Sequence, residues 1–146
     1  MMRAMAVFLA ARNNITLSSS VHDTLALLKK HFRLFVITNG NADINKFGID
    51  NYFEFALQPS QDTSPVVAMK PANDMFIESE RRLALSGNDI LYIGDHPTSD
   101  IKGSNQMGWQ SGWFNSNNTS FDHYKKSLQL PSFEFQAIND LTQLIT

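Results

Sequence analysis

A nearly continuous apolar run, residues 33–38 (RLFVIT), ends at the turn-forming sequence Thr38-Asn39-Gly40. A strand with one face in water alternates apolar and polar residues, whereas a run of this kind is typical of a strand covered on both faces. Residues 89–94 (DILYIG) repeat the pattern and are followed by Asp95. Such strands occur in parallel sheets that lie between helices, so the two runs predict an α/β fold.

Helix-like segments separate the strand-like segments along the chain. Apolar spacing and capping residues predict helices over residues 21–31, 43–47, 71–85, 99–107 and 139–145, and further strands over residues 53–57, 109–114 and 133–135. Strands joined through helices pair in parallel by right-handed crossovers. We therefore expect a three-layer α/β/α, Rossmann-like parallel sheet, and the 146 residues suffice for one core.

Composition limits the classes of partner. The 12 Lys and Arg residues are scattered among 14 Asp and Glu residues, which argues against a nucleic-acid partner. No apolar run approaches the ~20 residues of a membrane span. The chain has no cysteine, which excludes disulfides and is consistent with the cytoplasm. The apolar run within residues 1–11 is at the lower limit of length for a signal peptide. We expect instead a short helix that packs Met5, Phe8 and Leu9 on the body of the protein.

Several polar residues follow the predicted strands, where parallel α/β sheets bind their ligands. The hydroxyl of Thr38 is followed by Asn39 and by Gly40, which permits a tight turn. Such a turn directs backbone N–H groups at one anion, so the hydroxyl and these amides together suit a phosphoryl oxygen. Lys70 adds a compact positive charge that offsets phosphate and keeps a carboxylate ionised. The alternatives are an ordinary turn at Thr38 and a solvent-exposed Lys70.

Two carboxylates, Asp95 and Asp100, flank the turn GDHPTSD and are candidate ligands of Mg²⁺, which prefers oxygen. Asp100 has an alternative role as the N-cap of the helix that follows. His96 is a candidate acid or metal ligand, but a bystander role is favoured for an imidazole in a loop. His22, His31 and His123 have no partner at ligand spacing and receive no role.

The order of these features resembles the haloacid dehalogenase-like (HAD) hydrolases, most of which are Mg²⁺-dependent phosphatases. Thr38 is similar to the family's second motif, Lys70 to its third, and GDHPTSD to its fourth. The run Ile101-Lys102-Gly103 resembles the phosphatase branch, and the stretches VHDTL, ITNGNA and NYFEFAL resemble the bacterial flavin-biosynthesis type. The resemblance implies a small phosphorylated substrate, such as a ribitylamino-uracil phosphate or flavin mononucleotide.

The resemblance also implies roles for the residues. Thr38, the Asn39 amide and Gly40 would bind the phosphoryl oxygens, and Lys70 would stabilise the charge of the transition state. Asp95 would hold Mg²⁺ directly, while Asp100 would hold it directly or through water and orient Lys70.

One part of the family's chemistry is missing, because the chain contains no D-x-D sequence to supply the aspartate nucleophile. In the family this motif ends the first, central strand, and a helical cap follows it. We therefore expect residues 1–14 to be a remnant of the cap and residues 15–146 to be the C-terminal part of the core. A core without its first strand would have a gap, which the sheet closes, another segment fills, or a second chain covers by self-association.

The main hypothesis is therefore the C-terminal part of a Mg²⁺-dependent HAD-like phosphatase, inactive alone. The alternative is a protein that binds Mg²⁺ and a phosphorylated ligand without turnover. A phosphoacceptor receiver domain is disfavoured because its acidic pair precedes its hydroxyl and lysine, and here the acidic pair comes last. Dinucleotide binding is disfavoured because no G-x-G-x-x-G follows a strand.

Overall fold

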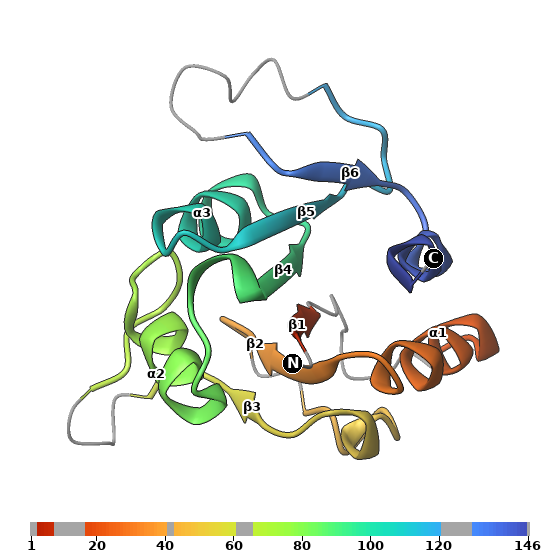
Figure 1. Ribbon diagram of the computed structural model, residues 1–146, viewed down its shortest axis with the longest axis horizontal. Helices are drawn as coiled ribbons and strands as arrows, with labels where there is room; N and C mark the ends of the chain where they lie inside the picture. Colours follow the sequence, from red (N-terminus) through yellow and green to blue (C-terminus); the bar gives the residue numbers. More distant parts are fainter. Residues whose placement is uncertain (1–2, 8–16, 41–42, 61–65, 121–129, 146) are drawn as a thin grey trace.

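The computed structural model describes residues 3–7, 17–40, 43–60, 66–120 and 130–145. Its centre is a six-stranded sheet with the order β3-β2-β1-β4-β5-β6, in which every neighbouring pair is parallel (Figure 1). The strands are β1 (Ala4–Val7), β2 (Arg33–Ile37), β3 (Ala56–Leu57), β4 (Ile90–Gly94), β5 (Gln110–Phe114) and β6 (Phe133–Phe135). The α/β fold class with a parallel sheet is confirmed.

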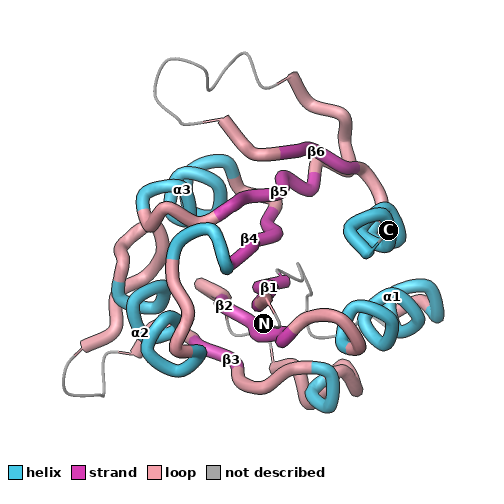
Figure 2. The backbone as a smooth tube through the Cα atoms, in the orientation of Figure 1, coloured by secondary structure: helices cyan, strands magenta, loops and turns pink. Residues whose placement is uncertain are grey.

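Helices cover both faces of this sheet (Figure 2). One face carries α2 (Asp74–Leu83), the π-helix η3 (Pro97–Lys102) and α3 (Gly103–Gln106). The other face carries α1 (Ser19–Lys29), with the short 3-10 helix η1 (Asp50–Tyr52) beside it, and the C-terminal 3-10 helix η5 (Ile138–Ile145). The 3-10 helix η2 (Gly87–Asp89) leads into β4. The molecule therefore has the predicted three layers.

A separate apolar core lies on each face of the sheet. On the α2 face, Phe76 packs edge-on against Tyr92 and Trp109, with ring centroids 5.6 and 5.2 Å away. On the α1 face, Leu25 and Leu28 are buried against Leu34 and other strand residues. Buried residues that alternate between the two cores are the reason why the strand sequences read as continuous apolar runs.

The central strand β1 corrects one prediction. Residues 4–7 form a strand between β2 and β4, where a short helix from a cap remnant was expected. Ala4 and Ala6 are buried in the core that holds the aromatic rings on the α2 face, and Met5 is buried on the α1 face. Pairing with the open edges of β2 and β4 outweighs the helix propensity of Ala and Met.

The sheet therefore has no gap: of the three outcomes anticipated for a missing strand, the chain adopts the one in which another segment fills the position. The predicted helical contacts of Phe8 and Leu9 lie outside the described residues. The boundary predicted between a cap remnant, residues 1–14, and the core stays a prediction, although residues 4–7 lie in the core sheet. Self-association also stays a prediction, although its premise of a gap is absent.

Some element boundaries differ from those predicted. Residues 43–47 form turns instead of a helix, and the predicted strand 53–57 is reduced to Ala56–Leu57. The helix α2 ends at Leu83 because Ala84 adopts a left-handed conformation (φ 53°), before the predicted stop at Gly87. The helix predicted over residues 99–107 begins earlier, as η3, and continues into α3.

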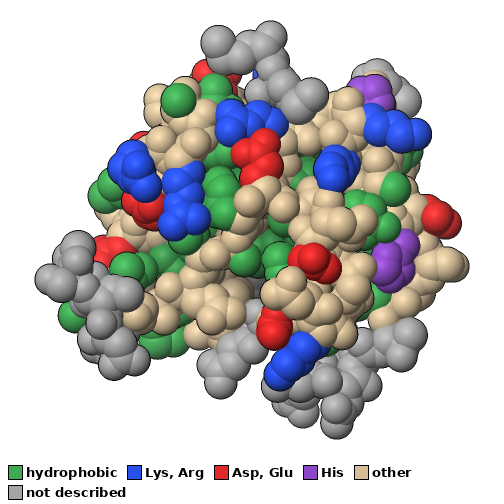
Figure 3. All heavy atoms as spheres, turned by 90° about the horizontal axis from the view of Figure 1, so that it is seen from below, with side chains coloured by type: hydrophobic (Ala, Val, Ile, Leu, Met, Phe, Trp, Pro, Cys, Tyr) green, Lys and Arg blue, Asp and Glu red, His purple; other side chains and the backbone are tan. Residues whose placement is uncertain are grey.

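The described residues contain no helix that is long and apolar enough to cross a membrane. On the face of the molecule seen in Figure 3, Lys and Arg side chains lie beside Asp and Glu side chains, with apolar groups between them. The two signs of charge are mixed on this face, as the scattered basic residues of the sequence predict.

Candidate functional site

The predicted site residues meet at the carboxyl edge of the sheet. Thr38 directly follows β2, and Asp95 directly follows β4, with β1 between these strands. Lys70, from the loop that precedes α2, donates a hydrogen bond to the backbone oxygen of Ile37 at 3.4 Å. The strands therefore bring together residues that are far apart in the sequence, as the parallel topology requires.

Lys70 forms a buried ion pair with Asp100. Lys70 Nζ lies 2.5 Å from Asp100 Oδ1, and the two side chains are 2% and 1% exposed. Lys70 Nζ also donates to the Tyr92 hydroxyl at 2.5 Å, and that hydroxyl lies 3.2 Å from both Asp100 Oδ1 and the Ile37 oxygen. The alternative of a solvent-exposed Lys70 is wrong. A buried amine requires this kind of pairing, because an isolated charge would be very unfavourable.

Tyr92 is a member of this cluster that sequence reasoning missed. It is fully buried, and burial followed by the negative charge of Asp100 raises the pKa of its hydroxyl well above the ordinary value. The hydroxyl therefore keeps its proton and can donate a hydrogen bond while it accepts one from Lys70. The only signal in the sequence was a polar atom within the run DILYIG, at a position that the sheet buries.

Gly94 is required for the position of Asp100. A Cβ at Gly94 would lie 2.4 Å from Asp100 Cβ and 2.6 Å from Asp100 Oδ2, closer than real contacts allow. Asp100 Oδ2 also accepts a hydrogen bond from the His96 backbone N–H at 3.0 Å. The carboxylate of Asp100 is thus bonded within the turn and to Lys70, and it does not cap a helix as the alternative reading proposed.

The side chain of Asn39 makes hydrogen bonds with both the backbone oxygen and the backbone N–H of Lys70. Its Nδ2 donates to the Lys70 oxygen at 2.9 Å, and its Oδ1 accepts from the Lys70 N–H at 2.7 Å. In the same turn, the Gly40 N–H donates to Thr38 Oγ1 at 3.1 Å. Thr38 is buried, and because its oxygen accepts this bond, its hydroxyl hydrogen is the group available to a ligand.

Asp95 differs from Asp100 in its surroundings. It is half-buried, and burial, followed by the charge of Asp100, raises the pKa of its carboxyl. Its backbone oxygen accepts a hydrogen bond from Trp113 Nε1 at 3.0 Å. The negative charge of Asp95 is therefore less favourable in the protein than on a free carboxyl group, and a bound cation would stabilise it.

The two carboxylates, Asp95 and Asp100, could supply only some of the ligands that a Mg²⁺ ion needs. Mg²⁺ is usually held by one or two carboxylates together with water and substrate phosphate. Asp95 is suited to such a contact, whereas Asp100 is already paired with Lys70. Within the described ranges, no group of three or more His, Cys, Asp or Glu side chains could enclose a metal ion.

His96 has a structural role. Its Nδ1 accepts hydrogen bonds from the backbone N–H groups of Thr98 and Ser99, at 3.3 and 3.1 Å, and so caps the start of η3. This arrangement agrees with the bystander reading favoured from the sequence and leaves no observation in support of a role as acid or metal ligand.

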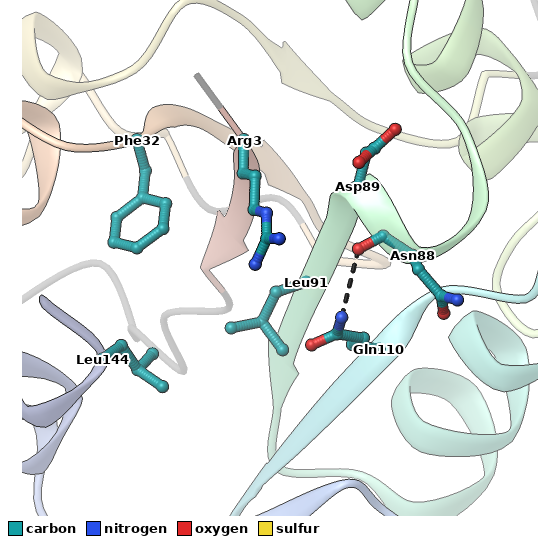
Figure 4. Close-up of a pocket in the computed structure, with 7 residues that line it drawn as sticks. All are labelled: Arg3, Phe32, Asn88, Asp89, Leu91, Gln110 and Leu144. Carbon is teal, nitrogen blue, oxygen red and sulfur yellow. Dashed lines mark hydrogen bonds between the residues drawn. The ribbon is translucent and has the colours of Figure 1, made fainter. Parts of the chain in front are cut away.

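A separate hollow of about 90 Å³ lies at the amino-terminal ends of the strands, opposite the candidate site (Figure 4). Arg3, Phe32 and Asp89 line it from the segments just before β1, β2 and β4. Gln110 Nε2 donates to the Asn88 oxygen at 3.1 Å beside it. None of the predicted site residues lines this hollow, so it has no part in the candidate site.

The fold and the site together define an α/β protein that gathers a hydroxyl, an amine and two carboxylates at the carboxyl edge of a parallel sheet. A family model for the haloacid dehalogenase-like hydrolases matches residues 2–108. The chain therefore belongs to the haloacid dehalogenase-like hydrolase family, and the resemblance derived from the sequence is confirmed.

Individual relatives agree with this assignment. The chain is 35% identical over 142 residues to the 5-amino-6-(5-phospho-D-ribitylamino)uracil phosphatase YigB of Escherichia coli K12, covering 97% of this chain and 58% of that protein. The crystal structure of a 2-haloacid dehalogenase from Pseudomonas syringae pv. Tomato DC3000 matches with a TM-score of 0.79 and 32% identity, covering 91% of this chain and 54% of that one. The HAD phosphatase of Thermococcus onnurineus, at 19% identity and a TM-score of 0.73, shares the fold. The chain thus spans little more than half the length of these relatives.

Proposed function

We propose that this chain forms the phosphate- and metal-binding part of a Mg²⁺-dependent phosphatase of small phosphorylated metabolites. The observation that carries the proposal is the buried Lys70–Asp100 ion pair beside Thr38 and Asp95, at the edge where α/β sheets bind ligands. The similarity to the E. coli phosphatase favours a flavin precursor as the substrate class. The lack of cysteine is consistent with a cytoplasmic localisation, which we also propose.

Each residue has a distinct proposed task. The hydroxyl of Thr38 and the backbone amide of Asn39 donate to phosphoryl oxygens, and Gly40 leaves room for the phosphate. Lys70 supplies positive charge, and its hydrogen bond to the Ile37 oxygen, at 3.4 Å, is long enough to be exchanged for one to a phosphoryl oxygen. Asp100 and Tyr92 hold the amine in position. Such preorganised charge is typically worth ~10²–10³ in rate.

Mg²⁺ would be held by Asp95, directly, and by Asp100, directly or through water. When bound, it supplies positive charge that offsets the phosphate. The half-buried Asp95 beside the charge of Asp100 supports this assignment, because a cation relieves the repulsion between the two carboxylates.

The nucleophile is not supplied by the residues of this chain. The sequence has no D-x-D, and its first acidic residue is Asp23. Neither β1 nor the sequence that directly precedes or follows it therefore carries a carboxylate. We propose that the aspartate belongs to sequence outside these 146 residues and that the chain alone does not turn over substrate. The 58% coverage of the E. coli relative supports this proposal.

A chimera tests the proposed function. The N-terminal part of the E. coli relative, up to the point where its match to this chain begins, is joined ahead of Met1. Hydrolysis of 5-amino-6-(5-phospho-D-ribitylamino)uracil is then measured with and without Mg²⁺. We expect Mg²⁺-dependent release of phosphate that Lys70→Ala or Asp95→Asn abolishes, and none from the chain alone. A folded chimera without activity, or a Lys70→Ala variant with a near-normal rate, would contradict the proposal.

The second candidate function is a protein that binds Mg²⁺ and a phosphorylated ligand without catalysis. The observation in its favour is that a strand without acidic residues fills the centre of the sheet. If this second function is correct, the chain alone binds phosphate in the presence of Mg²⁺, and the chimera with the E. coli sequence has no phosphatase activity.

A further inference from the structure

A second hollow, of about 150 Å³, adjoins Asp95 on the β5 side of the candidate site. Trp113 and Asn115, at the end of β5, form one wall, and the loop residues Ser116, Asn117 and Thr119 form the rim. A water molecule needs roughly 10–15 Å³ of such volume, so the hollow has room for a short chain of several atoms.

The wall of the hollow is held in place by hydrogen bonds. The side chain of Asn115 is buried: its Nδ2 donates to the Thr119 oxygen at 2.8 Å and to Glu134 Oε1 at 2.7 Å, and its Oδ1 accepts from the Thr119 N–H at 2.9 Å. The Asn115 N–H donates to the Phe135 oxygen at 2.8 Å. These bonds tie the loop to itself and to β6, so the hollow exists before a ligand arrives.

The hollow is also tied to the candidate site. Trp113 Nε1 donates to the backbone oxygen of Asp95 at 3.0 Å, which fixes the wall relative to the residue proposed to hold Mg²⁺. A ligand whose phosphate lies beside Asp95 therefore has this hollow within reach of the atoms next to its phosphate.

The side chains that line the hollow define the chemistry of the ligand. Ser116 and Asn117 are exposed at the rim, and their hydroxyl and amide make no hydrogen bond with the rest of the described chain. The lining contains one carboxylate, Asp95, and no Lys or Arg. It therefore offers donors and acceptors to neutral hydroxyl groups, and it offers no positive charge to a second phosphate.

We propose that this hollow binds the uncharged, hydroxyl-bearing part of a phosphorylated substrate, with Ser116 and Asn117 as the residues that select for hydroxyl groups. The proposal rests on the proposed function, since it requires the phosphate to lie at Thr38, Lys70 and Asp95. It adds a specificity site on the core of the protein, formed by β5 and the loop after it.

A pair of matched ligands tests the proposal. Glycerol 3-phosphate and n-propyl phosphate have the same carbon chain, but only the first carries hydroxyl groups. Calorimetry on the full 146-residue chain with Mg²⁺ should show glycerol 3-phosphate binding roughly three- to tenfold more tightly, the usual effect of one or two hydrogen bonds. Ser116→Ala/Asn117→Ala should remove this preference and leave the affinity for n-propyl phosphate unchanged.

Asn88→Ala is the control variant, because Asn88 is exposed at the opposite edge of the sheet and should leave the preference intact. Equal affinity for the two ligands, or a preference that survives the double substitution, overturns the specificity site while the proposed function stands. If neither these esters nor inorganic phosphate binds in the presence of Mg²⁺, the proposed function fails and this inference fails with it.

Discussion

At the scale of single residues, the absence of a side chain at Gly94 lets Asp100 reach Lys70. A Cβ at this position would lie 2.4 Å from Asp100 Cβ, so Asp100 or the turn would have to shift. We expect Gly94→Ala to lower the free energy of unfolding by ~1–3 kcal/mol, as overpacked sites do. Urea unfolding measures the change.

Gly40→Ala is the matched control, since the nearest atom to a Cβ there is Thr38 Oγ1 at 3.7 Å. This substitution should change stability little. Equal effects of the two substitutions would mean that contact with Asp100 is not what requires glycine at position 94.

The ion pair between Lys70 and Asp100 gives a second residue-scale prediction. Lys70→Met leaves the Asp100 carboxylate without its cation in a site that is 1% exposed, and we expect a loss of ~3–5 kcal/mol in the free energy of unfolding at pH 7. The double variant Lys70→Met/Asp100→Asn removes the unpaired charge and should recover part of this loss.

Arg81→Met serves as the comparison, because the Arg81–Glu78 pair lies at the surface with side chains that are 70% and 33% exposed. Its removal should have a small effect. A Lys70→Met effect as small as that of Arg81→Met would show that the buried pair does not contribute to stability.

At the scale of elements, the prediction concerns β1. Met5 is fully buried in the strand, whereas Met69 is 56% exposed in a loop. Met5→Ala should therefore cost ~2–5 kcal/mol of stability, and Met69→Ala should change it little, because only the first leaves a cavity. Chemical unfolding of both variants measures the difference. Similar small effects would contradict a central position for β1.

The helix α2 carries a pH-dependent pair. Hydrogen bonds from Arg81 and then Arg82 lower the pKa of Glu78 to about 2 from 4.5. A carboxyl with a lowered pKa in the folded state adds stability above its unfolded pKa and loses it as the pH falls toward the folded value. Glu78→Gln should therefore be slightly less stable than the parent at pH 6, and the difference in urea midpoint should shrink steadily as the pH falls from about 4.5 toward 2. A difference that does not change with pH would contradict this cause.

The elements that sequence reasoning predicted well are those set by local patterns. The run ending at Thr38 and the run ending at Gly94 are strands because residues buried on both faces leave a clear apolar signature. The strand β1 was missed because Ala and Met carry no strand signature, and its pairing depends on β2 and β4, which are remote in the sequence. The same holds for Tyr92, whose role depends on Lys70 and Asp100.

At the scale of the whole molecule, the polar residues at the carboxyl ends of the strands match the order of the family's motifs. The central strand β1, in contrast, contains no acidic residue. Thr38, Lys70, Asp95 and Asp100 come together as the order of the motifs predicts, and contacts place Lys70 against Asp100. Their individual roles toward phosphate and Mg²⁺ stay predictions, since these depend on a ligand. Sequence alone did not indicate that Asn39 holds Lys70 through its side chain, because that contact spans two loops.

The measurement that tests the central claim most directly is a titration of the pure chain with inorganic phosphate, with and without Mg²⁺, for the parent and for Asp95→Asn. Burial and then the charge of Asp100 raise the pKa of Asp95, so the ionised carboxylate does not stabilise the fold and the neutral Asn should preserve it. We predict that phosphate binds only in the presence of Mg²⁺ and that Asp95→Asn abolishes this binding. Phosphate binding that needs no Mg²⁺ or survives Asp95→Asn, or no binding at all, would contradict the assignment of this edge as a phosphate and metal site.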